Sequence, residues 1–216
     1  MLLFGEPTIA EVIAIVVAAL VGMTVHEFAH NYVGHLMGDP VPKATGRLTL
    51  DPRVHVNWTG FLMFVVVGFG ILGRAPIDPK RMRDPRWGYL FSVAAGPLAN
   101  LVLAVLSGIV FRLLSPLIVQ YRLDAVFTGF LVFVYFNALL FVLNVLPFFP
   151  LDGWHIVRSI LPAGLADRWA SERWLKATQY IFLALIVLSF IGGRANVLGI
   201  VIGRPTNAIT RVLLGY

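Results

Sequence analysis

The chain has 216 residues, of which 58% are apolar and only 13% are charged, and its mean hydropathy is +0.83. Soluble domains are about half apolar and about a quarter charged, so this composition excludes an ordinary soluble protein and indicates an integral membrane protein. The net charge of +6 would suit a nucleic-acid partner, but the basic residues lie in short loops between apolar segments, where cytoplasmic loops collect Lys and Arg. We therefore expect a lipid bilayer and no nucleic acid as partner.

Five apolar segments follow one another along the chain, at about 8–37, 58–72, 87–114, 125–146 and 175–193, before a mixed tail at 194–216. Four of them are near or above the roughly 20 residues that a spanning helix needs, whereas 58–72 is shorter. This pattern predicts a single domain, residues 1–216, that is an all-α polytopic membrane protein built as a helical bundle.

The first apolar segment ends in the motif His26-Glu27-Phe28-Ala29-His30. Two histidines four residues apart lie on one face of a helix and can bind one zinc ion, while Glu27 beside them can act on a metal-bound water. The alternative is a chance match in which each histidine is hydrogen-bonded to a neighbour. Because ionisable groups in an apolar helix are costly, the motif favours a catalytic site with one Zn²⁺ per chain.

A different pattern follows at 41–56, between the first two apolar segments. Polar and apolar residues alternate over Arg47–Leu50, and this stretch lies between Gly46 and the pair Asp51-Pro52. Such an alternation bounded by turn residues predicts a short strand, in a membrane-associated β-hairpin or sheet.

A catalytic zinc needs a third protein ligand and one open position, and the chain has no cysteine. Asp152 is the favoured candidate, because a lone carboxylate after an apolar helix requires a cation. Asp152 could instead cap the helix that begins at Gly153, and His155, three residues further on, could replace it as ligand. His55 is a weaker candidate, and His35 lies roughly opposite His26 on the helix.

At this point the sequence resembles the site-two proteases, zinc metalloproteases that cut inside membranes. Nearly the whole chain takes part in the resemblance, through HEFAH at 26–30, GHLMGDP and GRLTLDPRVH within 34–55, AAGPLAN at 94–100 and NVLPFFPLDG at 144–153. The resemblance implies His26, His30 and Asp152 as zinc ligands, Glu27 as general base and Asn144 as a polar contact to substrate or oxyanion. The chain shows no PDZ-like insertion or nucleotide-sensing module such as some members carry.

One departure from the family pattern concerns the residues after Asp152-Gly153. Many members continue there with a small residue and Arg, whereas Trp154 and His155 follow in this chain, which leaves His155 open as an accessory group. Within AAGPLAN, small residues predict close helix packing, and a direct active-site role for Asn100 is equally open.

The metal site also predicts the topology. If 58–72 crossed the membrane, His26 and Asp152 would emerge on opposite faces, which zinc bonds of about 2 Å forbid. We therefore expect 58–72 to be re-entrant or interfacial. The loop at 115–124 then carries only Arg122, and the other side is predicted to be cytoplasmic and to hold the active site, because it collects Lys43, Arg47, Arg53, Arg74, Lys80, Arg81, Arg83, Arg86, Arg158, Arg168, Arg173 and Lys176.

The expected function is that of a multi-pass intramembrane zinc metalloprotease in the cell membrane. It would hydrolyse peptide bonds within or near the transmembrane segments of single-span substrates, through a zinc-activated water with Glu27 as general base. The strand at 47–50 would hold the unwound substrate by main-chain pairing. The alternatives are a membrane metal-ion carrier, which should show ligands at several depths or repeated halves, and a non-catalytic metal-binding membrane protein.

Overall fold

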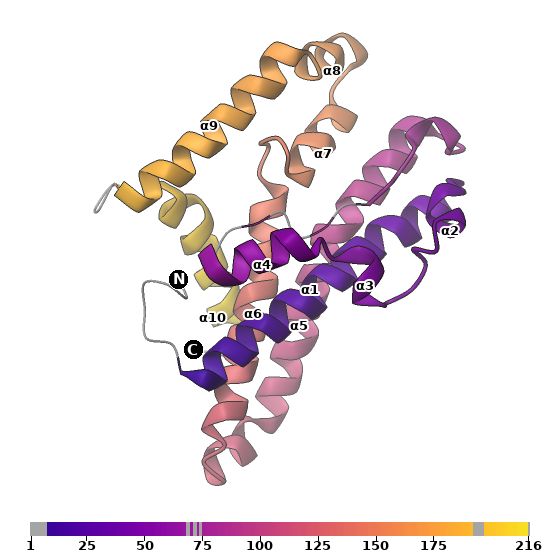
Figure 1. Cartoon of the computed structure of the whole chain (residues 1–216). Coiled ribbons are helices and arrows are strands. Elements are labelled where there is room, and N and C mark those ends of the chain that lie inside the picture. The colour runs from indigo at the N-terminus through magenta and orange to yellow at the C-terminus, as the bar shows by residue number, and fades with distance from the viewer. Residues whose placement is uncertain (1–7, 68–69, 71–72, 74, 192–196, 216) are drawn as a thin grey trace.

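The computed structural model describes residues 8–67, 70, 73, 75–191 and 197–215, and most of these residues are helical. Three of the described helices are long and apolar enough to cross a bilayer: α1 (Ile9–Leu36), α5 (Pro85–Gln120) and α6 (Asp124–Val145). They confirm the apolar segments predicted at 8–37, 87–114 and 125–146. α5 and α6 form an antiparallel pair, and α1 packs against both (Figure 1).

The first turn of α1 is closed by a capping box. The Thr8 hydroxyl accepts a hydrogen bond from the Glu11 backbone N–H, and the Glu11 carboxylate accepts one from the Thr8 backbone N–H. The helix ends at Leu36 and is followed by Gly38, whose φ of +109° is rarely adopted by residues with a Cβ. The motif HEFAH thus lies in the last three turns of a 28-residue helix.

α5 is longer than the sequence predicted. Its 36 residues run through Pro97 and Pro116, so the loop predicted at 115–124 is wrong for residues 115–120, and α6 begins at Asp124 after a short turn. A proline removes one backbone hydrogen bond, but neighbouring groups can satisfy the freed carbonyl within a helix bundle. α5 and α6 therefore form a continuous helical hairpin, whose turn lies at the end of the bundle farthest from the HEFAH motif.

Small residues let the three helices approach closely. At Gly22 of α1 an added Cβ would lie 2.9 Å from the side-chain oxygen of Asn137 and 3.2 Å from Leu140, both on α6. One buried apolar cluster surrounds this contact and consists of Ala18, Ala19, Met23, Phe136 and Leu140. A second cluster joins α5, α6 and the last described helix of the chain, and it consists of Ala104, Phe111, Ile118, Val134 and Leu214.

Between α1 and α5 the described chain contains the short helices α2 (Val41–Ala44), α3 (Pro52–His55), α4 (Trp58–Val67) and the 3-10 turn η1 (Pro79–Arg81). The loops around them are joined by Asp39, whose carboxylate accepts hydrogen bonds from the backbone of Val41 at 2.9 Å and of Asp78 at 2.7 Å. This buried carboxylate ties the end of α1 to the segment that leads into α5.

The strand predicted at 47–50 is wrong. The described residues contain no strand, and their single β-type pairing is an isolated bridge between Val56 and Gly73. Side chains take up the polar groups that a strand would use, because the His55 Nε2 donates to the Thr49 carbonyl at 2.6 Å and the Thr49 hydroxyl accepts from the Asp51 backbone at 3.2 Å. With these groups occupied locally, no ladder forms.

α4 occupies most of the segment predicted to be re-entrant, although residues 68, 69, 71 and 72 of that segment lie outside the described residues. Its ten residues correspond to a length of about 15 Å, half of the roughly 30 Å hydrocarbon core of a bilayer. Figure 1 shows α4 as a short helix near the middle of the much longer α1. The ten described residues of α4 are by themselves too few to span the hydrocarbon core.

The chain continues after α6 through α7 (Asp152–Ile160), α8 (Ala163–Trp169), α9 (Glu172–Ile191), the π-helical turn η3 (Gly199–Gly203) and α10 (Arg204–Leu214). α9 confirms a helix at the predicted 175–193 as far as Ile191, but it is not among the three described helices that are long and apolar enough to cross a bilayer. α10 folds back on the bundle: Leu214 belongs to the second apolar cluster, and the Arg112 guanidinium donates to the Leu213 carbonyl at 2.8 Å. The mixed tail is therefore helical and packed against α5 and α6 over its described residues.

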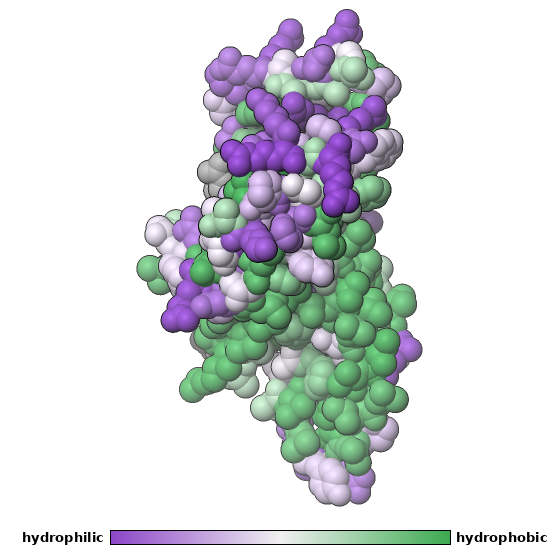
Figure 2. Space-filling model, turned by 90° about the vertical axis from the view of Figure 1, so that its right-hand side faces the viewer, coloured by the Kyte–Doolittle hydropathy of each residue, from purple (hydrophilic) through white to green (hydrophobic). Residues whose placement is uncertain are grey.

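Figure 2 shows how polar and apolar residues are distributed on one side of the molecule. Hydrophobic residues form a broad band over the lower half of this face, above a polar tip at the bottom, and hydrophilic residues gather in the upper half, where Figure 1 places α8, the C-terminal end of α1 and the N-terminal end of α5. The all-α polytopic prediction is confirmed for the described residues, whereas its β-hairpin is not.

Candidate metal centre and active site

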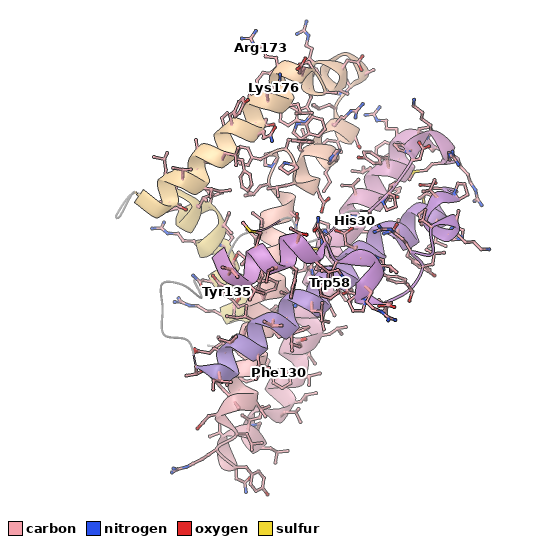
Figure 3. The ribbon with its side chains drawn as sticks, in the orientation of Figure 1. His30, Trp58, Phe130, Tyr135, Arg173 and Lys176 are labelled. Atoms are coloured by element: carbon pink, nitrogen blue, oxygen red, sulfur yellow. The ribbon has the colours of Figure 1, made fainter. Side chains whose placement is uncertain are left out.

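Two helices bring three potential metal ligands together. His26 and His30 are on α1, and Asp152 is the first residue of α7. The Asp152 Oδ2 lies 3.1 Å from the His26 Nε2 and 3.3 Å from the His30 Nε2, and the two Nε2 atoms are 3.0 Å apart. Both histidines are buried, and Figure 3 shows His30 in the middle of the molecule.

Hydrogen bonds determine which ring nitrogens face the cluster. The His30 Nδ1 lies 2.8 Å from the backbone carbonyl of Ser92, which can only accept, so this nitrogen carries the proton. The His26 Nδ1 lies 2.7 Å from the Asn100 Oδ1. The Asn100 amide nitrogen donates to the carbonyl of Gly22 and to Asn137, so its oxygen accepts from His26. Each Nε2 therefore has a free lone pair when its ring is neutral.

These atoms fit a zinc ion. The lone pairs of the two Nε2 atoms, 3.0 Å apart, repel each other, and the nearby Asp152 carboxylate adds negative charge. A shared cation would attract all three groups. The Asp152 Oδ2 is buried without a hydrogen bond. Ligands about 2 Å from a tetrahedral zinc are about 3.3 Å from one another, close to the observed separations. A donor set of two imidazoles and one carboxylate leaves the fourth position open, as in catalytic zinc sites.

Glycines create the room for this cluster. A Cβ added to Gly96 of α5 would lie 2.8 Å from the His26 Nε2 and closer still to the His30 Nε2. A Cβ added to Gly153 would overlap the backbone carbonyls of Val145 and Leu146 at the end of α6. Gly96 therefore keeps α5 clear of the ligand nitrogens, and Gly153 lets α7 start directly against α6, which places Asp152 beside the histidines.

Glu27 lies in a cavity of about 700 Å³ next to the cluster. His30 and Asp152 also line this cavity, together with Asn57, Tyr89 and His155. The Glu27 Oε2 is buried and has no hydrogen-bond partner among the described residues. Gly73 packs so closely on the Glu27 carboxylate that an added Cβ would overlap it. An unpartnered carboxylate oxygen beside potential metal ligands can accept a proton from water.

The other histidines have different positions. His155 lines the cavity and bonds to the Tyr89 hydroxyl at 2.9 Å, but it is not part of the three-residue cluster. Burial lowers the pKa of His155 below its usual value. The His35 Nδ1 lies 3.2 Å from the Asp39 carbonyl, and His55 bonds to Thr49. Asp152 makes no helix-capping hydrogen bond, because the N-cap position of α7 is Leu151.

Asn144 and Asn100 were both candidate site residues, and of the two only Asn100 contacts a ligand histidine. The Asn144 amide donates to the Leu140 carbonyl of its own helix at 3.0 Å, and its predicted contact to substrate stays a prediction. Asn100, whose role the sequence left open, contacts the His26 ring directly. Ser92 carried no signal of its own, and Gly96 was noted only as one of the small residues of AAGPLAN that predict close helix packing. Their spacing from Asn100 places all three on adjacent turns of α5, a pattern that is visible only once the histidines face that helix.

Comparison with known proteins gives several relatives. The chain is 33% identical over 178 residues to a Bacillus subtilis protein named "Putative zinc metalloprotease YwhC", covering 81% of this chain and 78% of the relative. The chain belongs to peptidase family M50, the site-two protease family. The sequence profile of that family matches residues 117–189, which include Asp152 but not the HEFAH motif. The protein is therefore a zinc-dependent metalloendopeptidase and a multi-pass membrane protein.

Mycobacterial members of the family are also similar. The chain is 31% identical over 193 residues to the Mycobacterium tuberculosis protein named "Putative zinc metalloprotease Rip2", covering 87% of this chain and 70% of that protein. It is 30% identical over 182 residues to the Mycolicibacterium smegmatis Rip2, covering 82% of this chain and 66% of that protein. No solved structure matches the chain significantly.

Proposed function

We propose that this M50 peptidase hydrolyses peptide bonds within or near the transmembrane segments of single-span membrane proteins, with zinc held by His26, His30 and Asp152. One observation carries the proposal: His26 and His30 are buried on a helix long enough to cross a bilayer, and the partly buried Asp152 lies against both of them. A peptide bond that reaches Glu27 beside them must come from a membrane-embedded or interfacial part of the substrate. Family membership favours a peptidase over the metal carrier that the sequence left open.

In the proposed mechanism the two Nε2 atoms and the Asp152 carboxylate hold the zinc, which supplies Lewis-acid activation of a water molecule and of the substrate carbonyl. Glu27 accepts a proton from the attacking water at Oε2, the oxygen without a protein partner. Glu27 then delivers this proton to the leaving amine. Asn100 and the Ser92 carbonyl keep the two imidazole rings in the tautomer and orientation that ligation requires.

A substrate helix must unwind before its peptide carbonyl can react, because the carbonyl is hydrogen-bonded within the helix. Each unsatisfied backbone group in lipid costs several kcal/mol. Asn57, Tyr89 and His155 line the cavity and offer polar partners for such groups. We therefore expect helix-breaking Gly or Pro near the scissile bond to raise cleavage of membrane substrates.

We further propose that the active site faces the cytoplasm and that α4 is re-entrant or interfacial. Most loops at the end of the bundle that carries the cluster are rich in Lys and Arg, while the turn between α5 and α6 carries Arg122. Cytoplasmic loops collect such residues. An α4 of ten residues leaves the loops before and after it on the same side.

Cysteine labelling tests this orientation in a chain that has no native cysteine. The exposed residues Lys43, Lys80 and Gln120 can each be replaced by Cys in intact cells or oriented vesicles. Lys43→Cys and Lys80→Cys should react with a membrane-impermeant reagent from the cytoplasmic side, and Gln120→Cys from the opposite side. Reaction of the first two from different sides would mean that the segment containing α4 spans the membrane.

The substitution Glu27→Gln tests the catalytic part of the proposal. The purified protein in liposomes, loaded with zinc, is given a single-span substrate, and cleavage is followed by mass spectrometry. Glu27→Gln should keep the zinc and lower the rate by about 10²- to 10⁴-fold, because Gln cannot accept the proton. Glu11→Gln, at the far end of α1, is the matched control and should cleave normally. A Glu27→Gln protein that cleaves at the wild-type rate would refute the general-base role.

A further inference from the structure

Tyr89 of α5 and His155 of α7 meet at the wall of the catalytic cavity. The Tyr89 hydroxyl and the His155 Nδ1 are 2.9 Å apart, and both residues line the same cavity as Glu27, His30 and Asp152. Over residues 8–67, 70, 73, 75–191 and 197–215, the His155 Nε2 has no protein hydrogen-bond partner. The pair therefore has hydrogen-bonding capacity that the fold does not use.

The number of polar hydrogens on the two side chains shows that the unused capacity is a hydrogen-bond donor. A neutral imidazole has one N–H and a tyrosine has one O–H, and their mutual bond uses one of the two. If Tyr89 donates, the remaining hydrogen is on the His155 Nε2; if His155 donates from Nδ1, the remaining hydrogen is on the Tyr89 oxygen. A protonated ring would add another donor. In every state the pair keeps at least one hydrogen to donate.

Helix spacing directs this donor toward the reacting centre. His155 lies three residues after Asp152 on α7, so both side chains are on one face of that helix. Tyr89 lies seven residues before Gly96 on α5, two turns away on the face that contacts the ligand histidines. The His155 ring is held by the rings of Phe149 and Trp154, whose centroids are 6.3 and 4.9 Å away.

The proposed reaction creates a need for such a donor. When water adds to the peptide carbonyl, a carbon–oxygen bond forms and the carbonyl electron pair moves onto oxygen, which becomes negatively charged. The pair returns as the carbon–nitrogen bond breaks and the amine takes the proton from Glu27. A prepositioned donor stabilises this oxygen, and the effect is stronger in a cavity that also has apolar walls, here Ala75, Ile77 and Val93.

We propose that the Tyr89–His155 pair donates a hydrogen bond to the substrate carbonyl oxygen as that oxygen becomes negatively charged. The inference rests on the proposed protease function and adds a catalytic residue pair to it. Neither residue gains or loses a proton over the cycle. Tyr89 and His155 are among the described residues that line the cavity, whereas Asn144 is not, and one of its amide hydrogens bonds to the Leu140 carbonyl.

The test compares His155→Phe with wild type, because Phe keeps an aromatic ring beside Phe149 and Trp154 but has no donor. Zinc content should stay at the wild-type level, kcat on a cleavable peptide should fall by about 10²- to 10³-fold, and KM should change little. Affinity for a phosphinic peptide, which mimics the tetrahedral state, should fall by a similar factor. Affinity for a non-cleavable ground-state peptide should not change.

Further variants distinguish the loss of the hydrogen-bond donor from a change in the packing of the rings. His155→Gln has an amide donor of similar reach and should recover part of the lost kcat. Tyr89→Phe combined with His155→Phe should be no worse than His155→Phe, because the pair acts as one unit. Tyr180→Phe, exposed on α9, is the control for loss of a hydroxyl and should behave as wild type.

The outcomes distinguish this inference from the protease function itself. Wild-type kcat in His155→Phe, with Glu27→Gln inactive in the same assay, would refute the inference and leave the function intact. Loss of zinc in His155→Phe would refute it by making His155 a metal ligand. A loss of rate without weaker phosphinic-peptide binding, or without any recovery in His155→Gln, would make the pair a packing contact only.

Discussion

The end of the α1–α5–α6 bundle that carries the metal cluster contains buried polar side chains beside the first apolar cluster, whereas the other end is packed by the apolar side chains of the second cluster. At the first end, hydrogen bonds run from His26 through Asn100 to Asn137 and so connect all three helices. At the opposite end, Phe111, Val134 and Leu214 of the second apolar cluster pack together. Figure 3 shows Phe130, which packs on this cluster, well below His30.

The two ends have different effects: the polar end orients a metal ligand, whereas the apolar end stabilises the fold. Hydrogen bonds between helices in a membrane contribute only about 0.6 kcal/mol on average, so the asparagine chain adds little to the free energy of folding. Its main effect is to hold one ring nitrogen of His26 so that the other faces the ligand cluster. In the apolar half, each side chain stabilises the fold by close packing, and a smaller side chain lowers stability according to the volume it leaves unfilled.

Gly96→Ala should have the largest effect, because the added methyl group enters the space around both ligand nitrogens. We expect loss of zinc binding and of cleavage, since moving either ring aside breaks its bond to Asn100 or Ser92. Metal analysis of the purified protein measures this. Gly129→Ala on α6, where nothing lies within 4 Å of an added Cβ, is the matched control and should keep its zinc. Full zinc occupancy in Gly96→Ala would contradict the assigned ligand atoms.

Asn100→Leu should have an intermediate effect. Leu fills a similar volume but cannot accept the hydrogen bond from the His26 Nδ1, and loss of such an outer partner typically weakens metal affinity by about 10- to 100-fold. Competition with a zinc chelator measures the affinity. Asn137→Leu removes the hydrogen bonds to Asn100 and to the Phe133 carbonyl but leaves the bond between Asn100 and His26, so it should weaken zinc binding less. Equal affinities for all three proteins would show that the polar end does not orient the histidine.

Val134→Ala should have the smallest effect on function. Val134 is fully buried in the apolar half, so its truncation should lower the free energy of unfolding by about 1–2 kcal/mol while zinc affinity stays unchanged. Unfolding in detergent gives the first quantity and chelator competition the second. Val102→Ala, on an exposed face of α5, should change neither. Zinc loss in Val134→Ala would mean that the two halves are coupled.

The sequence predicted the features that depend on local periodicity. Apolar length identified α1, α5 and α6, and the four-residue spacing of His26 and His30 placed both on one helix face. The requirement that Asp152 reach them also predicted that 58–72 does not span the membrane, and this topology stays a prediction. The strand predicted at 47–50 is wrong. Alternation over only four residues is weak evidence for a strand when neighbouring side chains can bond the same backbone groups.

Composition and spacing alone determined that this is a membrane protein with a histidine pair on one helix, because hydropathy and the 3.6-residue period are properties of single segments. Tertiary structure alone decided that Asn100 and the Ser92 carbonyl hold the two rings, that Gly96 leaves room for the ligand atoms and that Tyr89 meets His155. These contacts join residues more than 60 positions apart. They depend on how each helix is rotated and shifted against the next, which packing across the whole bundle determines and no single segment encodes.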